Sequence, residues 1–119
     1  MRRIVGVVAI AFAAYLIAQP LVVANALGLP HETSTQWINL RASWGGTLAG
    51  LGAFVAWLPA PRPPWGRLAI ALVAWAMAGI GIARLVGFAV DGGPDTRQYI
   101  WISAEALLAI GGLVALRRK

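Results

Sequence analysis

Charged side chains inside apolar segments are the residues of this sequence best suited to chemistry. Arg41, Arg84 and Glu105 each stand within a long apolar stretch. A charge exposed to hydrocarbon costs several kcal/mol, so embedded charges pair with one another or face a polar cavity. Arginine also recognises planar acceptors through two parallel hydrogen bonds. We therefore expect these three side chains to meet in one shared site.

The depths of these charges favour the same conclusion. Gln36, Asp91 and Arg97 mark the outer ends of the three apolar segments. Counted from those marks at about 1.5 Å per residue, the charges lie roughly 8, 10 and 12 Å below the outer surface. Glu105 is expected to pair with Arg84, because their segments are hairpin neighbours. Asp91 follows Arg84 on the same helical face and is expected to share it.

Two interpretations of this cluster stay open. It can be a buried salt-bridge network that fixes helix register and binds nothing. It can also be a pocket for an anionic or carbonyl-bearing ligand that enters from the outer leaflet, because two arginines face one glutamate within the spans and leave one positive charge unmatched. The residues of the predicted cluster, including nearby hydrogen-bonding side chains, are Arg41, Arg84, Glu105, Asp91, Asn39, Ser43 and Gln98.

The elements that must position these residues are membrane spans. The chain has 119 residues, of which 60% are hydrophobic and only 12% charged, whereas about 25% charged is usual for soluble domains. Four segments approach the roughly 20 residues that a spanning helix needs: 4–26, 36–58, 65–90 and 97–116. We expect a single all-α transmembrane domain over 1–119, folded as an antiparallel four-helix bundle.

Turn-forming residues separate the segments. The stretch PAPRPPWGR, 59–67, has four prolines and cannot continue a helix. DGGPD, 91–95, is a turn for similar reasons, with Asp95 or Thr96 as the expected helix N-cap. Beyond Pro20 the first segment can continue as a short interfacial helix that stops at Gly28 and Pro30. A cleavable signal peptide is the alternative for this region, and we expect a retained helix.

Basic residues predict the orientation of the spans. With four spans, Arg97 is the only Lys or Arg at the outer end, beside Glu32, Asp91 and Asp95. Lys and Arg concentrate on the cytoplasmic side of membrane proteins. We therefore expect a multi-pass protein of the bacterial inner membrane with both termini in the cytoplasm. The residues on that side are Arg2, Arg3, Arg62, Arg67, Arg117, Arg118 and Lys119.

Glycines in the second and third segments are expected to be helix contact surfaces. Lipid tails are as apolar as leucine, so helices in a bilayer gain mainly from close packing, which small residues permit. We favour packing within this chain over a dimer motif. The predicted contact residues are Gly45, Gly46, Gly50, Gly79, Ala83 and Gly87.

Other chemistry has little support. The chain has no cysteine and one histidine, His31, so neither a thiolate nucleophile nor a clustered metal site is expected. We identify no catalytic triad, phosphate-binding loop, paired-carboxylate site or cofactor motif. The basic residues flank apolar segments and form no stripe, which argues against nucleic acid as a partner.

A family resemblance rests on residues spread along the chain. They are Pro20, Leu27-Gly28-Leu29-Pro30, Asn39-Leu40-Arg41-Ala42-Ser43-Trp44-Gly45-Gly46, Arg84, Asp91-Gly92 and Glu105. This pattern resembles the small four-helix membrane proteins of domain-of-unknown-function family 4345, which have an aromatic residue, often tyrosine, where Trp44 stands here. The resemblance implies four spans and no particular activity. The architecture is also similar, more loosely, to DoxX-like proteins.

Three classes of function follow. The first is a non-catalytic accessory or scaffold subunit that packs against a larger membrane complex, with lipids and other membrane-protein subunits as partners. The alternative is a protein that binds or transports a small ligand, lipid or quinone through the Arg/Glu cluster. Small multidrug transporters rank lower because the first span lacks an acid. A membrane enzyme with Glu105 as general acid or base ranks last.

Overall fold

The structure is a computed structural model that describes residues 1–57 and 64–118. Within these ranges the regular secondary structure is helical throughout, which confirms the all-α prediction. Part of the predicted proline-rich break at 59–67, including Arg62, lies outside the described residues, as does Lys119.

The first predicted span, 4–26, consists of two helices. They are α1 (Arg2–Ala18) and α2 (Pro20–Leu27), which meet at an angle of 86°. Pro20 occupies the first turn of α2, where its missing N–H costs nothing, but its ring prevents α1 from continuing. Gly28 ends α2 in the left-handed conformation, with φ of 65°. The predicted short helix after the first span is therefore present as α2.

The second predicted span, 36–58, is a continuous rod of three parts. They are α3 (Ser34–Leu40), the π-helical turn η1 (Arg41–Gly46) and α4 (Thr47–Ala56). The rod begins at Thr33, which exchanges capping hydrogen bonds with Gln36. Four of the six residues of η1 are buried: Arg41, Ala42, Gly45 and Gly46.

The last two predicted spans match α5 (Trp65–Asp91) and α6 (Thr96–Arg117). Asp95 caps α6 by accepting a hydrogen bond from the backbone N–H of Gln98, as one of the two predicted N-caps. Both helices are long and apolar enough to cross a membrane. The pair α1–α2 meets the same criterion only when its two bent parts are counted together.

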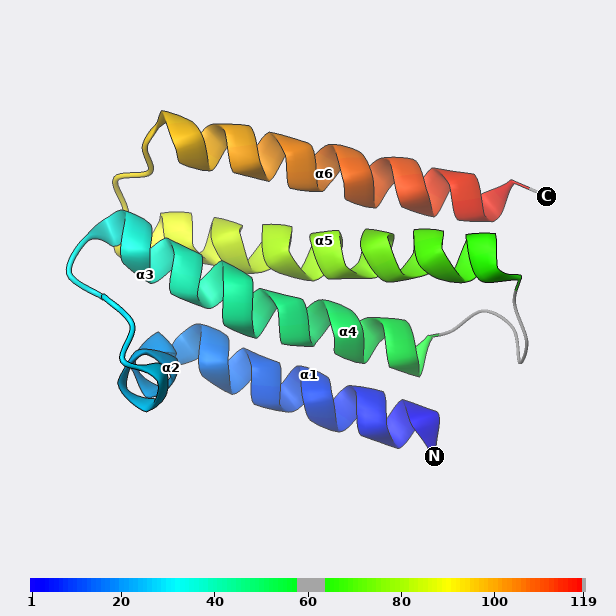
Figure 1. The fold of residues 1–119 in the computed structure, drawn as a ribbon, viewed down its shortest axis with the longest axis horizontal. Coiled ribbons are helices and arrows are strands. Elements are labelled where there is room, and N and C mark those ends of the chain that lie inside the picture. Colours follow the sequence, from blue (N-terminus) through cyan, green and yellow to red (C-terminus); the bar gives the residue numbers. More distant parts are fainter. Residues whose placement is uncertain (58–63, 119) are drawn as a thin grey trace.

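The helices are arranged as a row (Figure 1). The rod α3–η1–α4 packs between α1 and α5, and α6 packs against the other side of α5. The molecule measures 45 × 31 × 20 Å. A width of 31 Å is what four helices side by side need at about 8–10 Å between axes. This open layer differs from the closed bundle implied by the predicted fold class.

Glycines let the neighbouring helices approach closely, as predicted. A Cβ on Gly50 would lie 2.6 Å from the Cα of Ala76, and one on Gly46 would lie 2.7 Å from the Cα of Ile80. Gly79 faces this same pair of glycines from α5. The contact between the rod and α5 is therefore nearly backbone to backbone, which fixes the positions of the side chains nearby.

The other predicted small residues pack within the chain as well. Gly45 faces Ile17 of α1, and Gly87 faces Ile38 of α3. Ala83 is fully buried. A contact that the sequence analysis did not single out joins Gly6 of α1 to the α4 backbone. All six predicted positions thus form intramolecular helix contacts.

Candidate functional site

Arg84 and Glu105 form a buried ion pair between α5 and α6, as predicted. The Nη2 of Arg84 lies 2.8 Å from Oε1 of Glu105, and its Nε donates to both carboxylate oxygens at 3.0 and 3.1 Å. The two residues are only 5% and 6% exposed. Parallel donation from a guanidinium to a carboxylate is the strongest form of this pair.

Two amide side chains complete the shell around Arg84. Its Nη1 donates to Oδ1 of Asn39 at 3.0 Å and to Oε1 of Gln98 at 2.6 Å. Gln98, in turn, donates from Nε2 to Oδ1 of Asn39 at 3.1 Å. This polar network joins α3, α5 and α6, so it ties together elements from three of the predicted spans.

Arg41 forms a second, separate ion pair. Its Nε and Nη2 donate to the carboxylate of Asp91 at 2.9 and 3.1 Å, and its Nη1 donates to the backbone carbonyl of Ile17. Arg41 is 7% exposed. The prediction that Asp91 shares Arg84 is wrong, because both carboxylate oxygens of Asp91 accept hydrogen bonds from Arg41. The predicted unmatched positive charge is also wrong, since each arginine has its own carboxylate.

The single predicted cluster is thus two sites. The first site consists of Arg41 and Asp91, near the contact between α1 and η1. The second lies between α3, α5 and α6 and consists of Arg84, Glu105, Gln98 and Asn39. Ser43 makes no side-chain hydrogen bond within residues 1–57 and 64–118. Within the π-helical turn Arg41 is buried, whereas Ser43 is exposed.

A cleft of about 440 Å³ opens above the Arg84–Glu105 pair. Asn39 and Ser43, both exposed, form its polar edge on the rod. The apolar lining comes from α5 and α6, and sequence reasoning missed it. The signal was available, since these residues stand beside Arg84 or Glu105 or one to two helical turns away: Met77, Ile80, Trp101, Ala104 and Leu108.

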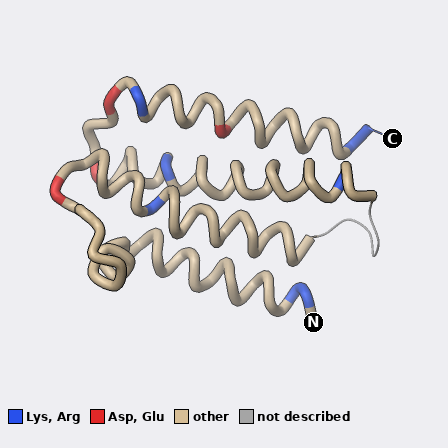
Figure 2. The backbone as a smooth tube through the Cα atoms, in the orientation of Figure 1, with Lys and Arg blue, Asp and Glu red and all other residues tan. Residues whose placement is uncertain are grey.

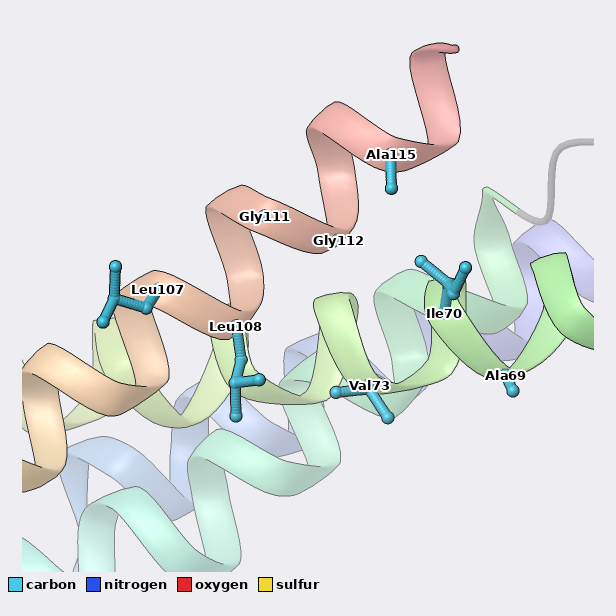
Figure 3. A pocket seen from close by; sticks show the side chains of 8 residues that line it. All are labelled: Ala69, Ile70, Val73, Leu107, Leu108, Gly111, Gly112 and Ala115. Atoms are coloured by element: carbon cyan, nitrogen blue, oxygen red, sulfur yellow. The ribbon is translucent and has the colours of Figure 1, made fainter. Parts of the chain in front are cut away.

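A second groove, of about 400 Å³, lies between α5 and α6 nearer the chain termini (Figure 3). Its lining is entirely aliphatic or glycine, including Ile70, Val73, Leu108 and Gly112. It therefore offers no hydrogen-bonding side chain to a ligand, unlike the cleft above Arg84.

The charge balance of the polar sites limits their chemistry. Both carboxylate oxygens of Glu105 accept hydrogen bonds from Arg84, and the lining of the cleft contains no second carboxylate. Across the described part of the chain, histidines and carboxylates form no group of three or more that could hold a metal ion. The arrangement is suited to binding and orientation.

Comparison with known proteins agrees with the resemblance drawn from the sequence. The model of the family described as "Domain of unknown function (DUF4345)" matches residues 3–116. No curated protein and no solved structure matched the chain. The looser similarity to DoxX-like proteins therefore gains no support. Because the match extends over nearly the whole sequence, the chain belongs to the DUF4345 family.

Proposed function

We propose that this protein spans the membrane four times, through α1, the rod α3–η1–α4, α5 and α6, with α2 lying along the outer interface. The lengths of α5 and α6, 27 and 22 residues, support spans of roughly 40 and 33 Å. The hydrocarbon core is about 30 Å thick. The 86° bend at Pro20 turns α2 across the direction of α1, as an interfacial helix requires.

The same proposal places both termini in the cytoplasm of a bacterial cell. Both chain ends lie at one end of the row, and Lys and Arg gather there (Figure 2). Arg2 and Arg3 begin α1, Arg67 lies in the first turn of α5, and Arg117 ends α6. The positive-inside rule assigns that end to the cytoplasmic face of the inner membrane.

Within this frame the protein binds an amphiphilic small molecule in the cleft above Arg84, without catalysis. The observation that carries this function is the exposure of Asn39 and Ser43 on the open side of the cleft. In the proposed four-span arrangement both side chains lie within the membrane, where an uncovered polar group costs several kcal/mol. A ligand head group that hydrogen-bonds to them, with its tail against Trp101 and Leu108, removes that cost.

The network around Arg84 prepares the site for binding. Arg84 donates to Glu105, Asn39 and Gln98 at once, so the floor of the cleft is fixed before a ligand arrives. A fixed site loses less side-chain entropy on binding than a mobile one. The ion pair therefore acts as a support for the polar edge of the cleft.

Copurified lipids test this function. Ala104 lines the cleft and is exposed, so Ala104→Phe should fill it without touching the ion pair. Ala11→Phe, on an exposed position of α1, is the matched control. Protein extracted in native-lipid nanodiscs is analysed by mass spectrometry. Wild type and the Ala11 variant should retain one amphiphile in near-stoichiometric amount, and the Ala104 variant should lose it. The same lipid profile in all three would refute ligand binding.

A second candidate, an accessory subunit of a larger membrane complex, is favoured by one feature of α6. Gly111 and Ala115 are exposed and four residues apart, and a Cβ on Gly111 would contact nothing. Such small pairs allow another helix to approach closely. A pull-down in mild detergent tests this role, because a chain that always runs alone would exclude it.

A further inference from the structure

We infer that the ligand of this cleft is a neutral amphiphile whose head group carries a carbonyl oxygen, and that Asn39 is the residue that selects it. This inference rests on the proposed binding function and narrows it to one ligand class. Three observations lead to it: the charge balance of the embedded residues, the orientation of two amide side chains, and the donors left over at the edge of the cleft.

The charge balance excludes an ionic head group. Arg84 is paired with Glu105, and Arg41 with Asp91, each through two guanidinium nitrogens. All four side chains are 10% exposed or less. A charged ligand would enter a low-dielectric site without a counter-charge and would lose its hydration there. A neutral head group meets no such penalty.

The guanidinium of Arg84 determines how the amides face. Arginine can only donate hydrogen bonds, so the atoms of Asn39 and Gln98 that meet its Nη1 must be carbonyl oxygens. Gln98 then directs its Nε2 to the same Oδ1 of Asn39. The Oδ1 of Asn39 thus accepts two hydrogen bonds, one from Arg84 and one from Gln98. The Nδ2 of Asn39 takes no part in this network.

The leftover groups at the edge of the cleft can both donate a hydrogen bond. Within the described ranges of the chain, neither Nδ2 of Asn39 nor Oγ of Ser43 has a hydrogen-bond partner. The two residues are four apart on the rod, a spacing that brings them together on one helical face. Both line the cleft. A carbonyl oxygen has two lone pairs and can accept from both donors at once.

Three probes with chains of the same length test which charge and which head group the cleft prefers. They are 2-dodecanone, dodecyl phosphate and dodecane, each titrated into the protein in nanodiscs. The ketone should bind about tenfold more tightly than the other two, in line with a hydrogen bond to a desolvated donor. The infrared stretch of a ¹³C-labelled ketone should also move to lower frequency when it binds. This second readout needs no variant.

Asn39→Asp tests the selecting residue. Aspartate keeps an acceptor for Arg84 and Gln98 but removes both Nδ2 hydrogens, so affinity for 2-dodecanone should fall about tenfold. The matched control is Asn25→Asp, at an exposed position of α2 that lies outside the cleft, and its affinity should equal that of wild type.

The outcomes separate the inference from the proposed function. Tightest binding by dodecyl phosphate, abolished by Ala104→Phe, would overturn the neutral-ligand inference while leaving the binding function in place. An unshifted carbonyl stretch in the bound ketone, or equal ketone affinities in Asn39→Asp and Asn25→Asp, would overturn the role of Asn39. If Ala104→Phe changes the binding of none of the three probes, both the inference and the proposed binding function are overturned.

Discussion

At the scale of single residues, the main feature of the protein is two ion pairs that are almost completely withdrawn from solvent. A buried pair contributes little net stability when intact, because desolvation offsets the attraction between its charges. Removal of one partner is costly because it leaves an uncompensated charge. The two arginines differ in their additional hydrogen bonds. Arg84 donates to two side-chain amide oxygens besides its carboxylate, and Arg41 donates to the backbone carbonyl of Ile17.

Glu105→Gln should therefore destabilise the protein by about 3–5 kcal/mol, because it leaves Arg84 buried without a counter-charge. The double variant Arg84→Met with Glu105→Leu should recover most of that loss, since apolar residues of similar size replace both charges. Reversible unfolding in mixed micelles measures both effects. Ser103→Ala, two residues away on α6 and exposed, with a hydroxyl bonded only to its own helix, is the control. Equal stabilities of wild type and Glu105→Gln would contradict this role.

Only part of this pairing follows from the sequence. Arg84 and Glu105 lie on consecutive helices at similar depth, so their contact could be predicted. Asp91 was assigned to the wrong arginine, because helical periodicity gives the face of a residue but not which helix crosses there. The hydrogen bond from Gln98 to Asn39 forms only because three helices meet at this point, and no local sequence pattern encodes such a meeting.

At the scale of elements, close backbone contact holds the rod against α5. Glycines at the contact remove the Cβ atoms that would keep the two helices apart. If the protein is in a bilayer, as proposed, lipid competes equally well for apolar side chains, so this close approach is the main source of helix association there. The position of the cleft follows from it, because Asn39 and Arg84 are brought together by the same crossing.

Gly50→Ala should consequently destabilise the protein by about 1–3 kcal/mol, through overpacking against the α5 backbone. Gly111→Ala makes the same chemical change where a Cβ would contact nothing, so it should be neutral or stabilise α6 by up to about 1 kcal/mol. Thermal unfolding of both variants in the same detergent compares them. If Gly50→Ala proves as stable as Gly111→Ala, the contact surface is not at the rod–α5 crossing.

Helix boundaries were the most predictable feature at this scale. The bounds of α5 and α6 fall within one residue of the predicted spans, since Pro64, Gly92 and Asp95 are local stop and start signals. The angle at Pro20 and the π-helical turn were not predictable. Proline dictates that a helix breaks, but tertiary packing sets the angle, and the glycines of η1 permit several backbone geometries.

At the scale of the whole molecule, the row of helices gives the protein an open side. α6 packs against α5 and buries only Gln98, Glu105 and Ala109. A closed bundle would have covered the Arg84 site with another helix, whereas the row leaves a cleft. Sequence periodicity predicted the helices but not this layer, because apolar residues face lipid as readily as protein and so carry no signal for closure.

The proposed orientation can be tested by cysteine labelling, for which the chain needs no background changes because it has no cysteine. Glu32→Cys should react with a membrane-impermeant maleimide in intact spheroplasts, because the proposed orientation puts Glu32 at the outer end. Arg3→Cys and Arg118→Cys should react only after permeabilisation. Labelling of Arg3→Cys in intact spheroplasts would contradict the four-span orientation.

The most direct measurement is the nuclear Overhauser contact of the Asn39 side-chain amide hydrogens in protein held in native-lipid nanodiscs. If the cleft is a binding site, these hydrogens should show cross-peaks to head-group protons of one bound amphiphile, and Ala104→Phe should abolish them. Cross-peaks only to the methylene protons of bulk acyl chains, unchanged in the Ala104 variant, would mean that the polar edge of the cleft faces lipid and that no ligand occupies it.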